Sequence, residues 1–156
     1  MLKKILFILV LFPIFAFAQN TLRSKGFDDT MIWNHISMKG TTLLKHYWED
    51  RATGNIAHAS TYMDRHFQSI YYFGALDKSG ELNVIQNLNL TNYSLSRMVE
   101  TRHDDLMILT YIALVDETLN GQEIRYQESP CMTIWKHIDG RWKLMAHSEL
   151  TTHNMQ

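Results

Sequence analysis

Residues 129–154 read SPCMTIWKHIDGRWKLMAHSELTTHN, and this stretch says most about the fold. It consists of two apolar, strand-like runs on either side of Asp139-Gly140, followed by a polar segment. An Asp-Gly pair between two β-rich runs is the strongest short-range signal for a β-hairpin, because glycine accepts the positive φ angle of a tight turn. Trp135 and Trp142 flank the turn, and each is large enough to anchor a core. The stretch therefore predicts a β-hairpin packed by two tryptophans.

The part of the chain that precedes this hairpin begins with patterns typical of helices. Apolar residues between Met31 and Trp48 recur at spacings of three and four, which is typical of a helix with one buried face, and Asp28-Asp29 supplies a helix N-cap. Gly40 is expected to kink or divide this helix. The pattern then predicts a second helix over 56–67, a strand over 69–73, a turn over 77–80, and a short helix capped by Ser79.

From Tyr93 onward the pattern changes to that of strands. Residues 93–100 alternate between the two faces of a half-exposed strand, and residues 106–115 are apolar on both parities, as in a strand covered on both sides. Asn120-Gly121 predicts another hairpin turn. Helices followed by a meander of about four long antiparallel strands indicate an α+β domain with helices packed on one face of a curved sheet.

Residues 1–18 are typical of a secretory signal peptide. Lys3 and Lys4 form the charged region, residues 5–17 the apolar region, and Ala16-Phe17-Ala18 a cleavage site. The apolar run is too short for a membrane-spanning helix, which needs roughly 18 residues or more, and Pro13 interrupts it. The sequence thus predicts a secreted or periplasmic protein that has no membrane association after signal cleavage.

Charge and cysteine content exclude some classes of function. Loss of Lys3 and Lys4 with the signal lowers the net charge of −1 by two units, and no basic stripe is visible, so nucleic-acid binding is not expected. Cys131 is the single cysteine, so no internal disulfide can form. We expect Cys131 to be a small buried strand residue.

Three ordered segments resemble the C-terminal half of nuclear transport factor 2-like proteins. These are LTNYSLSRMVETRHDDLMILTYIALVD (90–116), TIWKHIDGRW (133–142) and KLMAHSELT (143–151). The bacterial SnoaL-like branch is the most similar, with its Y-x-L-S strand, L-T-Y strand and W-x-x-x-x-G-R-W hairpin. The resemblance is good over 93–151 and is one of pattern alone over 43–73. It implies a domain over 27–152 with a cone-shaped α+β fold, in which a strongly curved antiparallel sheet wraps around N-terminal helices and encloses a pocket, often in a homodimer.

The resemblance implies a pocket but no substrate, because the same fold serves isomerases, dehydratases, cyclases, self-association modules and non-catalytic binders. Acid–base chemistry in such a pocket needs a buried carboxylate or histidine opposite a hydrogen-bond donor. The candidate catalytic residues are Asp64, His137 and His147, with Tyr72 or Tyr111 as the donor. The candidate pocket-lining residues are Tyr47, Trp48, Tyr62, Tyr72, Tyr111 and Trp135.

Strand alternation bears on which histidine faces the interior. His147 is on the opposite parity from Trp142, whereas His137 is on the same parity as Trp135. If Trp142 points into the cone, regular alternation turns His147 away from it, although a bulge would reverse this. His137 and His147 therefore remain alternatives.

No motif in the sequence indicates a metal or a cofactor. There is no H-E-x-x-H pattern or cysteine–histidine cluster, and neither a G-x-S-x-G motif nor a glycine-rich phosphate loop occurs. Two hypotheses follow. The first is an exported protein that binds a small, largely apolar molecule in a hydrophobic pocket, with cofactor-independent lyase or isomerase chemistry as the expected reaction class. The second is a non-catalytic interaction module that forms a homodimer through the outer face of its sheet.

Overall fold

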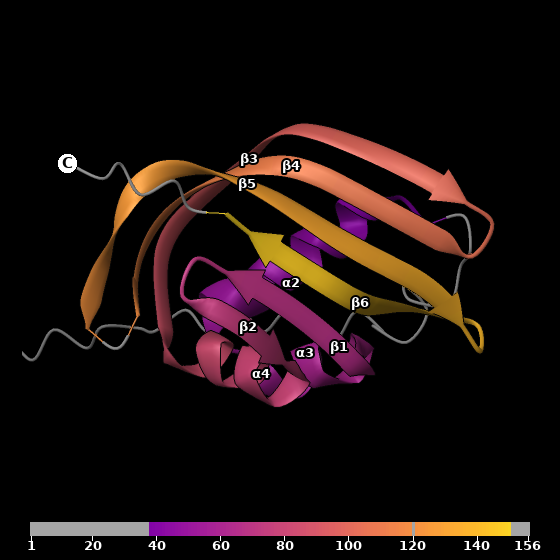
Figure 1. The fold of residues 1–156 in the computed structure, drawn as a ribbon, viewed down its shortest axis with the longest axis horizontal. Coiled ribbons are helices and arrows are strands. Elements are labelled where there is room, and N and C mark those ends of the chain that lie inside the picture. The colour runs from indigo at the N-terminus through magenta and orange to yellow at the C-terminus, as the bar shows by residue number, and fades with distance from the viewer. Residues whose placement is uncertain (1–37, 120, 151–156) are drawn as a thin grey trace, which may run out of the picture.

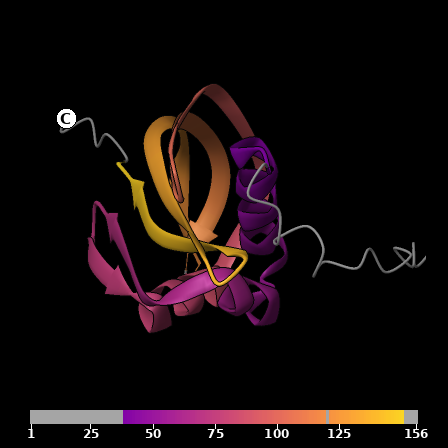
Figure 2. The same cartoon turned by 90° about the vertical axis from the view of Figure 1, so that its right-hand side faces the viewer.

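The structure, a computed structural model, describes residues 38–119 and 121–150, which form one curved sheet with helices against its concave side (Figures 1 and 2). The predicted signal peptide and the expected helix upstream of residue 38 lie outside the described residues. The elements in chain order are α2 (Gly40–Thr53), α3 (Ile56–Tyr62), β1 (Met63–Tyr71), β2 (Gly74–Asp77), α4 (Lys78–Asn87), β3 (Leu88–His103), β4 (Leu106–Leu119), β5 (Gln122–Ile138) and β6 (Arg141–Glu149).

The six strands lie in the order β2-β1-β6-β5-β4-β3. All neighbouring strands are antiparallel except β1 and β6, which are parallel. Strands β3, β4 and β5 bend strongly over the helices (Figure 1), and the β3–β4 pairing contains two irregularities, one of them around Arg97, whose φ is +52°. Such bulges increase local bending and twist. The predicted α+β cone with a curved sheet is confirmed, whereas the parallel β1–β6 pair was not predicted.

The hairpin between β5 and β6 forms where the sequence predicts it. Asp139 and Gly140 have φ angles of +50° and +78°, the combination that a type I′ turn requires. Trp135 and Trp142 on the two strands are fully buried. The predicted hairpin and its tryptophan core are therefore confirmed.

Helix α2 lies against the sheet along one apolar face. Its buried residues include Leu43, Leu44, Tyr47 and Trp48, and they recur at helical spacing. Gly40 begins the helix at a point of close approach, because a Cβ atom at this position would lie 2.5 Å from Sδ of Met107. Its backbone N–H donates to Oε2 of Glu100 over 2.9 Å. Gly40 therefore allows the start of the helix to touch the sheet.

Two predicted boundaries differ from the structure. The second helix was expected to continue to Phe67 but ends at Tyr62, because the chain from Met63 pairs with β6 as a strand. The N-cap of α4 is Asp77 and not Ser79, since Oδ1 of Asp77 accepts a hydrogen bond from the N–H of Gly80 over 2.8 Å. In both cases tertiary pairing or a competing cap outweighs local propensity.

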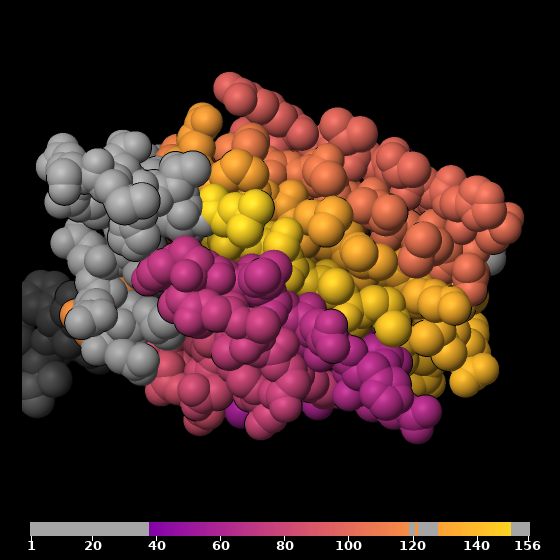
Figure 3. Space-filling model, viewed as in Figure 1, coloured from indigo at the N-terminus to yellow at the C-terminus, as the bar shows by residue number. Residues whose placement is uncertain are grey.

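The outer face of β4 is apolar but only partly covered. Ile108, Ile112 and Leu114 are half-buried, whereas Met107 and Leu109 on the inner face are fully buried. Figure 3 views the sheet from this outer side, and no helix of the described chain lies over it. The expectation that β4 is covered on both faces is therefore wrong for the described part of the chain.

Candidate functional site

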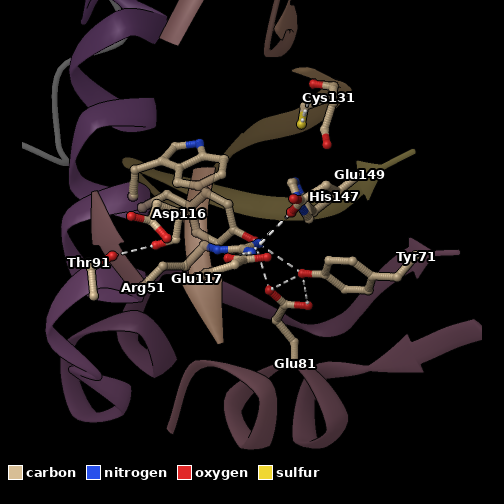
Figure 4. Close-up of polar contacts among 12 residues, drawn as sticks. Arg51, Tyr71, Glu81, Thr91, Asp116, Glu117, Cys131, His147 and Glu149 are labelled. Atoms are coloured by element: carbon tan, nitrogen blue, oxygen red, sulfur yellow. Dashed lines mark hydrogen bonds and ion pairs between the residues drawn. The ribbon is translucent and has the colours of Figure 1, made fainter. Parts of the chain in front are cut away.

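A buried arginine lies at the centre of the interior. Arg51 is on the last turn of α2, is only 1% exposed, and points between the helix and the concave face of the sheet (Figure 4). The side chains around it come from four elements: Tyr71 on β1, Glu117 on β4, and His147 and Glu149 on β6, with Glu81 on α4 just beyond them. We call Arg51 and these five residues, together with Tyr47, the Arg51 cluster.

Two buried carboxyl groups flank the guanidinium. Nη2 of Arg51 lies 3.0 Å from Oε2 of Glu149 and 3.8 Å from Oε2 of Glu117. The guanidinium also lies over the ring of Trp48, 4.7 Å from its centroid, which is a cation–π distance. Arg51 is thus held between an aromatic face and two acids, and Glu149 is its closer partner.

Tyrosine hydroxyls link Arg51 to a third carboxylate. Nη1 of Arg51 donates to the hydroxyl oxygens of Tyr47 and Tyr71 over 3.2 and 3.0 Å. Both hydroxyls donate in turn to Glu81, over 2.7 and 2.9 Å, and Ser69 adds a donor at 2.8 Å. Burial, followed for Tyr47 by the charge of Glu81, raises the pKa of both tyrosines well above the ordinary value, so both stay protonated as donors.

The two acids beside Arg51 have pKa values that move in opposite directions. Burial, together with the charge of Glu149, raises the pKa of Glu117 to about 7 even though Arg51 opposes the shift. Burial also acts on Glu149, but the closer Arg51 and a hydrogen bond from His147 hold the pKa of Glu149 below its ordinary value. When the pKa values of two neighbouring carboxyl groups are separated in this way, one group (Glu117) can accept or donate a proton while the other (Glu149) stays ionised.

Several polar atoms of this region have no hydrogen-bond partner among the described residues. They are Oε2 of Glu117, Nδ1 of His147 and Nε of Arg51. Buried polar atoms in folded proteins are nearly always paired with protein or water. This end of the interior thus contains polar atoms that the described residues leave unsatisfied.

The interior therefore has two different ends. Around Trp135 and Trp142 it is filled by apolar side chains, including Leu43 and Met107. Toward the far ends of β4 and β6 the inward positions become polar, with Glu117 and Glu149 almost completely buried. The apolar end forms the core, and the polar end is the candidate functional site.

A β-bulge brings His147 into this site. In the β5–β6 pairing Ile134 lies opposite Ala146 but Trp135 lies opposite Leu144, so Met145 is an extra residue. Before Met145 the buried side chains are at even-numbered positions, and beyond it they are at odd-numbered ones. His147 therefore faces the same side of the sheet as Trp142. The expectation from regular alternation, that His147 points away if Trp142 points inward, is therefore wrong. Nε2 of His147 lies 3.3 Å from Nη1 of Arg51.

The other two candidate catalytic residues lie elsewhere. Asp64 is at the start of β1, where Oδ1 accepts a hydrogen bond from the N–H of His66, and it lines an outer groove of about 750 Å³ with Lys136 and Arg141. His137 is half-buried near the hairpin turn, with its ring 5.2 Å from that of Trp142. No contact of the described residues joins either side chain to the Arg51 cluster.

Five of the six predicted pocket-lining aromatic residues are in the interior: Tyr47, Trp48, Tyr62, Tyr111 and Trp135 are all buried. Nε1 of Trp48 donates to the hydroxyl of Tyr111 over 3.1 Å. Tyr72 is 48% exposed, and the inward position belongs to its neighbour Tyr71. The prediction for Tyr72 is therefore corrected, because β1 ends at Tyr71 and Tyr72 lies in the turn that follows.

Residues that sequence reasoning missed include Arg51, Glu81 and Glu117. Arg51 could have been found, because it follows Tyr47 by four residues on the buried face of the helix. Glu117 also continues the inward parity of Tyr111 along β4. No signal in the sequence marks Glu81, which reaches the interior only because α4 packs against β1.

A second buried acid lies outside the Arg51 cluster. Asp50 accepts a hydrogen bond from the hydroxyl of Tyr62 over 2.7 Å, and its Oδ2 lies 2.8 Å from Nδ1 of His58. Burial raises the pKa of Asp50 despite these contacts. The group ties α2 to α3, and we assign it a structural role.

The described residues include no group of three or more histidine, cysteine or acidic side chains placed to hold a metal ion. Cys131 is buried on β5, and burial raises the pKa of its thiol far above the ordinary value, so the thiolate is not formed at neutral pH. Within the same part of the chain, we find no helix with the length and apolar character needed to span a membrane.

No protein-family model matches this chain, and no curated protein matches it in sequence. Solved structures do match it. A nuclear transport factor 2-like protein from Cytophaga hutchinsonii superposes with a TM-score of 0.67 at 12% identity, covering 81% of this chain and 99% of that one. The chain has the nuclear transport factor 2-like fold.

Two further matches differ in what they are described to be. A protein from Parabacteroides distasonis described as a candidate ketosteroid isomerase superposes with a TM-score of 0.55 at 12% identity, over 73% of this chain and 88% of that one. The association domain of C. elegans CaMKII superposes with a TM-score of 0.58 at 10% identity, over 71% and 92%. Nuclear transport factor 2-like structures thus include both enzyme-like and association modules.

Proposed function

We propose that this protein binds a small organic molecule at the polar end of its cone and transfers a proton on it without a cofactor, as a lyase or isomerase. The observation that carries the proposal is Glu117, a buried carboxyl group with a pKa of about 7 and an oxygen that no described residue binds. A general acid–base group works best when its pKa lies near the working pH.

The surroundings of Glu117 support this role. Glu149 and Arg51 carry fixed opposite charges beside it, so a change in the charge of Glu117 changes its electrostatic interaction with both of them. Tyr111 stays protonated, since burial raises the pKa of its hydroxyl, and it remains the candidate hydrogen-bond donor. Glu117 takes the place of Asp64 and His137 as the proposed base, and His147 stays in the candidate set as a neighbour of Arg51 and Glu149.

The aromatic side chains next to the cluster suit the carbon skeleton of the ligand. Trp48 and Tyr93 stack at 5.4 Å between ring centroids, and Tyr111 lies edge-on to Trp48. Binding pockets for small molecules are mostly apolar with a few placed polar groups. We therefore keep the proposal of a largely apolar ligand but add one polar group that reaches Glu117.

Thermal-shift screening of the protein without residues 1–18 tests this function directly. We expect small cyclic molecules with one polar group to raise the melting temperature, because a ligand that binds only the folded state stabilises it. The stabilisation should be lost in Glu117→Gln and kept in Glu128→Gln, since Glu128 is exposed on β5. Hits that stabilise Glu117→Gln as well as the wild type would contradict a site at Glu117.

A second candidate function is homodimerisation, and the outer sheet face favours it. Ile108 on β4 lies opposite Ile134 on β5, and both are half-buried in a face that no described helix covers. Apolar sheet faces of this kind are buried in symmetric dimers. On this hypothesis the protein is an interaction module, and the Arg51 cluster only stabilises the fold.

Light scattering with Ile134→Lys separates the two readings. A charge in the centre of the outer face should convert a dimer to a monomer, whereas Thr41→Lys, at an exposed position of α2 on the opposite side of the sheet, should not. A wild-type protein that is strictly monomeric at high concentration would contradict the module. Export also remains part of the proposal, and mass spectrometry of the protein from the native culture medium or periplasm should show a chain that begins at Gln19.

A further inference from the structure

A groove lies on the outer face of the sheet, beside the β5–β6 hairpin. Strand β1 pairs with β6 at Met63, opposite Leu144, and pairs again at Gln68, opposite Ala146. Four residues of β1 thus lie against one residue of β6, Met145, and the regular pairing is interrupted between these points. The start of β1 and the two strands of the hairpin line the groove at this interruption, and its volume is about 750 Å³.

The lining of this groove carries more positive than negative charge. Its basic residues are Arg65, Lys136, Arg141 and Lys143, and its acidic residues are Asp64 and Asp139. One of the acids is engaged by its own chain, because Oδ1 of Asp64 accepts a hydrogen bond from the backbone N–H of His66. The chain as a whole has a net charge of −1, so positive charge is concentrated here against the overall balance. A concave surface with charge of one sign attracts ions of the opposite sign.

Two of the basic residues repel each other across the hairpin. Lys136 on β5 lies directly opposite Lys143 on β6, and like charges in this position destabilise a sheet. Both point outward, because Trp142, next to Lys143, is fully buried on the inner face. Nζ of Lys136 lies 3.6 Å from Oδ2 of Asp105, whereas Nζ of Lys143 donates to the carbonyl oxygen of Thr61, which is neutral. A bound anion would reduce this repulsion.

The two arginines of the groove are exposed and have unused donors. No hydrogen bond or ion pair joins the guanidinium of Arg65 or Arg141 to another described residue. A guanidinium presents a planar set of N–H donors that matches carboxylate and phosphate groups. The lining also includes the half-buried apolar side chains of Ile138 and Met145. The groove therefore offers both donors for an anion and an apolar contact surface.

We infer that this outer groove binds a small organic anion, in which a phosphate or carboxylate group is joined to an apolar body. Arg65 and Arg141 bind the anionic group, and Ile138 and Met145 contact the apolar body. The volume of the groove lies within the range of small-molecule sites, roughly 300–1,000 Å³. The site is on the opposite face of the sheet from the Arg51 cluster and goes beyond the proposed function.

Phenyl phosphate is the probe, because it joins a phosphate group with a charge of about −1.5 to −2 at neutral pH to an apolar ring. Inorganic phosphate supplies the charge without the ring, and phenol supplies the ring without the charge. The readout is the set of backbone amide NMR signals of Arg65, Ile138, Arg141 and Met145 in the protein without residues 1–18. We expect phenyl phosphate to shift these signals to saturation, with higher affinity than inorganic phosphate, and to bind more weakly as sodium chloride is added.

Three results of this titration would overturn the inference. The first is that phenyl phosphate leaves the signals of the groove unchanged. The second is that phenol shifts them as strongly as phenyl phosphate does, because the groove then does not select an anion. The third is that inorganic phosphate binds as tightly as phenyl phosphate, because the apolar body then contributes nothing.

The double variant Arg65→Gln/Arg141→Gln removes both guanidinium groups. We expect it to bind phenyl phosphate about tenfold more weakly than wild type, or more weakly still. Lys39→Gln/Lys45→Gln is the matched control, since it removes two exposed positive charges at and near the start of α2, and it should bind as wild type does. Equal affinity of the arginine variant and wild type would contradict the site. The salt dependence and the phenol comparison use the wild-type chain, so they test the inference even if the variant does not fold.

Anionic lipids carry the same phosphate chemistry, and vesicles distinguish them from a free ligand. We expect phosphatidylglycerol vesicles to sediment no more protein than phosphatidylcholine vesicles, because the chain as a whole is negatively charged. Sedimentation with phosphatidylglycerol that is lost in Arg65→Gln/Arg141→Gln, together with no binding of phenyl phosphate, would assign the groove to a membrane surface and overturn the free ligand.

Discussion

Nη2 of Arg51 lies 3.0 Å from Oε2 of Glu149, and both side chains are almost completely buried inside the cone. Buried ion pairs contribute little to stability compared with apolar residues of the same size, but loss of one partner is strongly destabilising. Apolar packing alone could stabilise the core without this ion pair. The pair lies beside Glu117, and we connect it to the protonation of that residue.

Arg51→Met removes the positive charge and leaves the three acids of the cluster uncompensated. We expect the free energy of unfolding to fall by roughly 3–5 kcal/mol at neutral pH, the cost typical of breaking a buried pair. The loss should be smaller near pH 5, because the pKa values of Glu117 and Glu149 rise without Arg51 and the acids become neutral. Urea denaturation at both pH values measures this, with Lys45→Met as the control on the exposed side of the same helix. Equal losses at the two pH values would contradict the pairing.

Glu117→Gln tests the raised pKa of Glu117 through stability. A carboxyl group whose pKa is about 7 in the folded state and 4.5 in the unfolded state binds more protons when folded, so stability declines as pH rises through this window. The neutral amide removes that decline. We expect the variant to gain up to roughly 3 kcal/mol relative to wild type between pH 5 and pH 8.5. If the free energies of unfolding of wild type and variant change with pH in parallel, as expected for the exposed control Glu128→Gln, the pKa of Glu117 is not raised.

Glu149→Gln should lower the pKa of Glu117. The charge of Glu149 is one of the causes that raise the pKa of Glu117, and Glu149 also occupies the nearer side of Arg51. Without that charge, Arg51 stabilises the ionised form of Glu117 more strongly. Titration of the Glu117 carboxyl signal in the variant measures the shift, and an unchanged or higher pKa would mean that the two acids do not interact.

Gly40→Ala tests how closely α2 approaches the sheet. Alanine favours helices over glycine by about 1 kcal/mol, but at this position its methyl group would lie 2.5 Å from Sδ of Met107 and 2.8 Å from Cδ2 of Leu109. We expect a net loss of roughly 1–3 kcal/mol from overpacking. Thermal and urea unfolding should show this loss, whereas Thr41→Ala, at the next and exposed position, should be close to neutral. A stabilised Gly40→Ala would refute the close approach.

Local signals predicted much of the fold. The Asp139-Gly140 turn, the two tryptophans and the strand alternation from Tyr93 onward led to the curved sheet, because hairpin register follows from turn chemistry and side-chain period. The parallel pairing of β1 with β6 was missed, since it joins segments that lie far apart in the chain and have no turn between them. The same pairing explains why residues 63–67 form a strand and not the end of a helix.

The candidate site was predicted less well, and the reason is physical. A single extra residue, Met145, reverses the parity of β6 and turns His147 inward, and no local signal predicts such a bulge. Charged residues are rarely buried unless paired, so the sequence assigns Glu81 to the surface, and the helical position of Arg51 indicates its face but not its partners. Their partners become visible only when the helices and the sheet are assembled.

The pKa of Glu117 in the wild-type protein is the quantity on which the proposed site depends most directly. Carbon-detected NMR of the side-chain carboxyl groups, recorded from pH 3 to pH 9 without ligand, measures it alongside Glu149 and the exposed Glu128. We expect Glu117 to titrate near pH 7 and Glu149 to titrate below the ordinary range for glutamate. If Glu117 titrates near the ordinary glutamate value of 4.5, it is not a group poised for proton transfer, and the proposed chemistry is wrong.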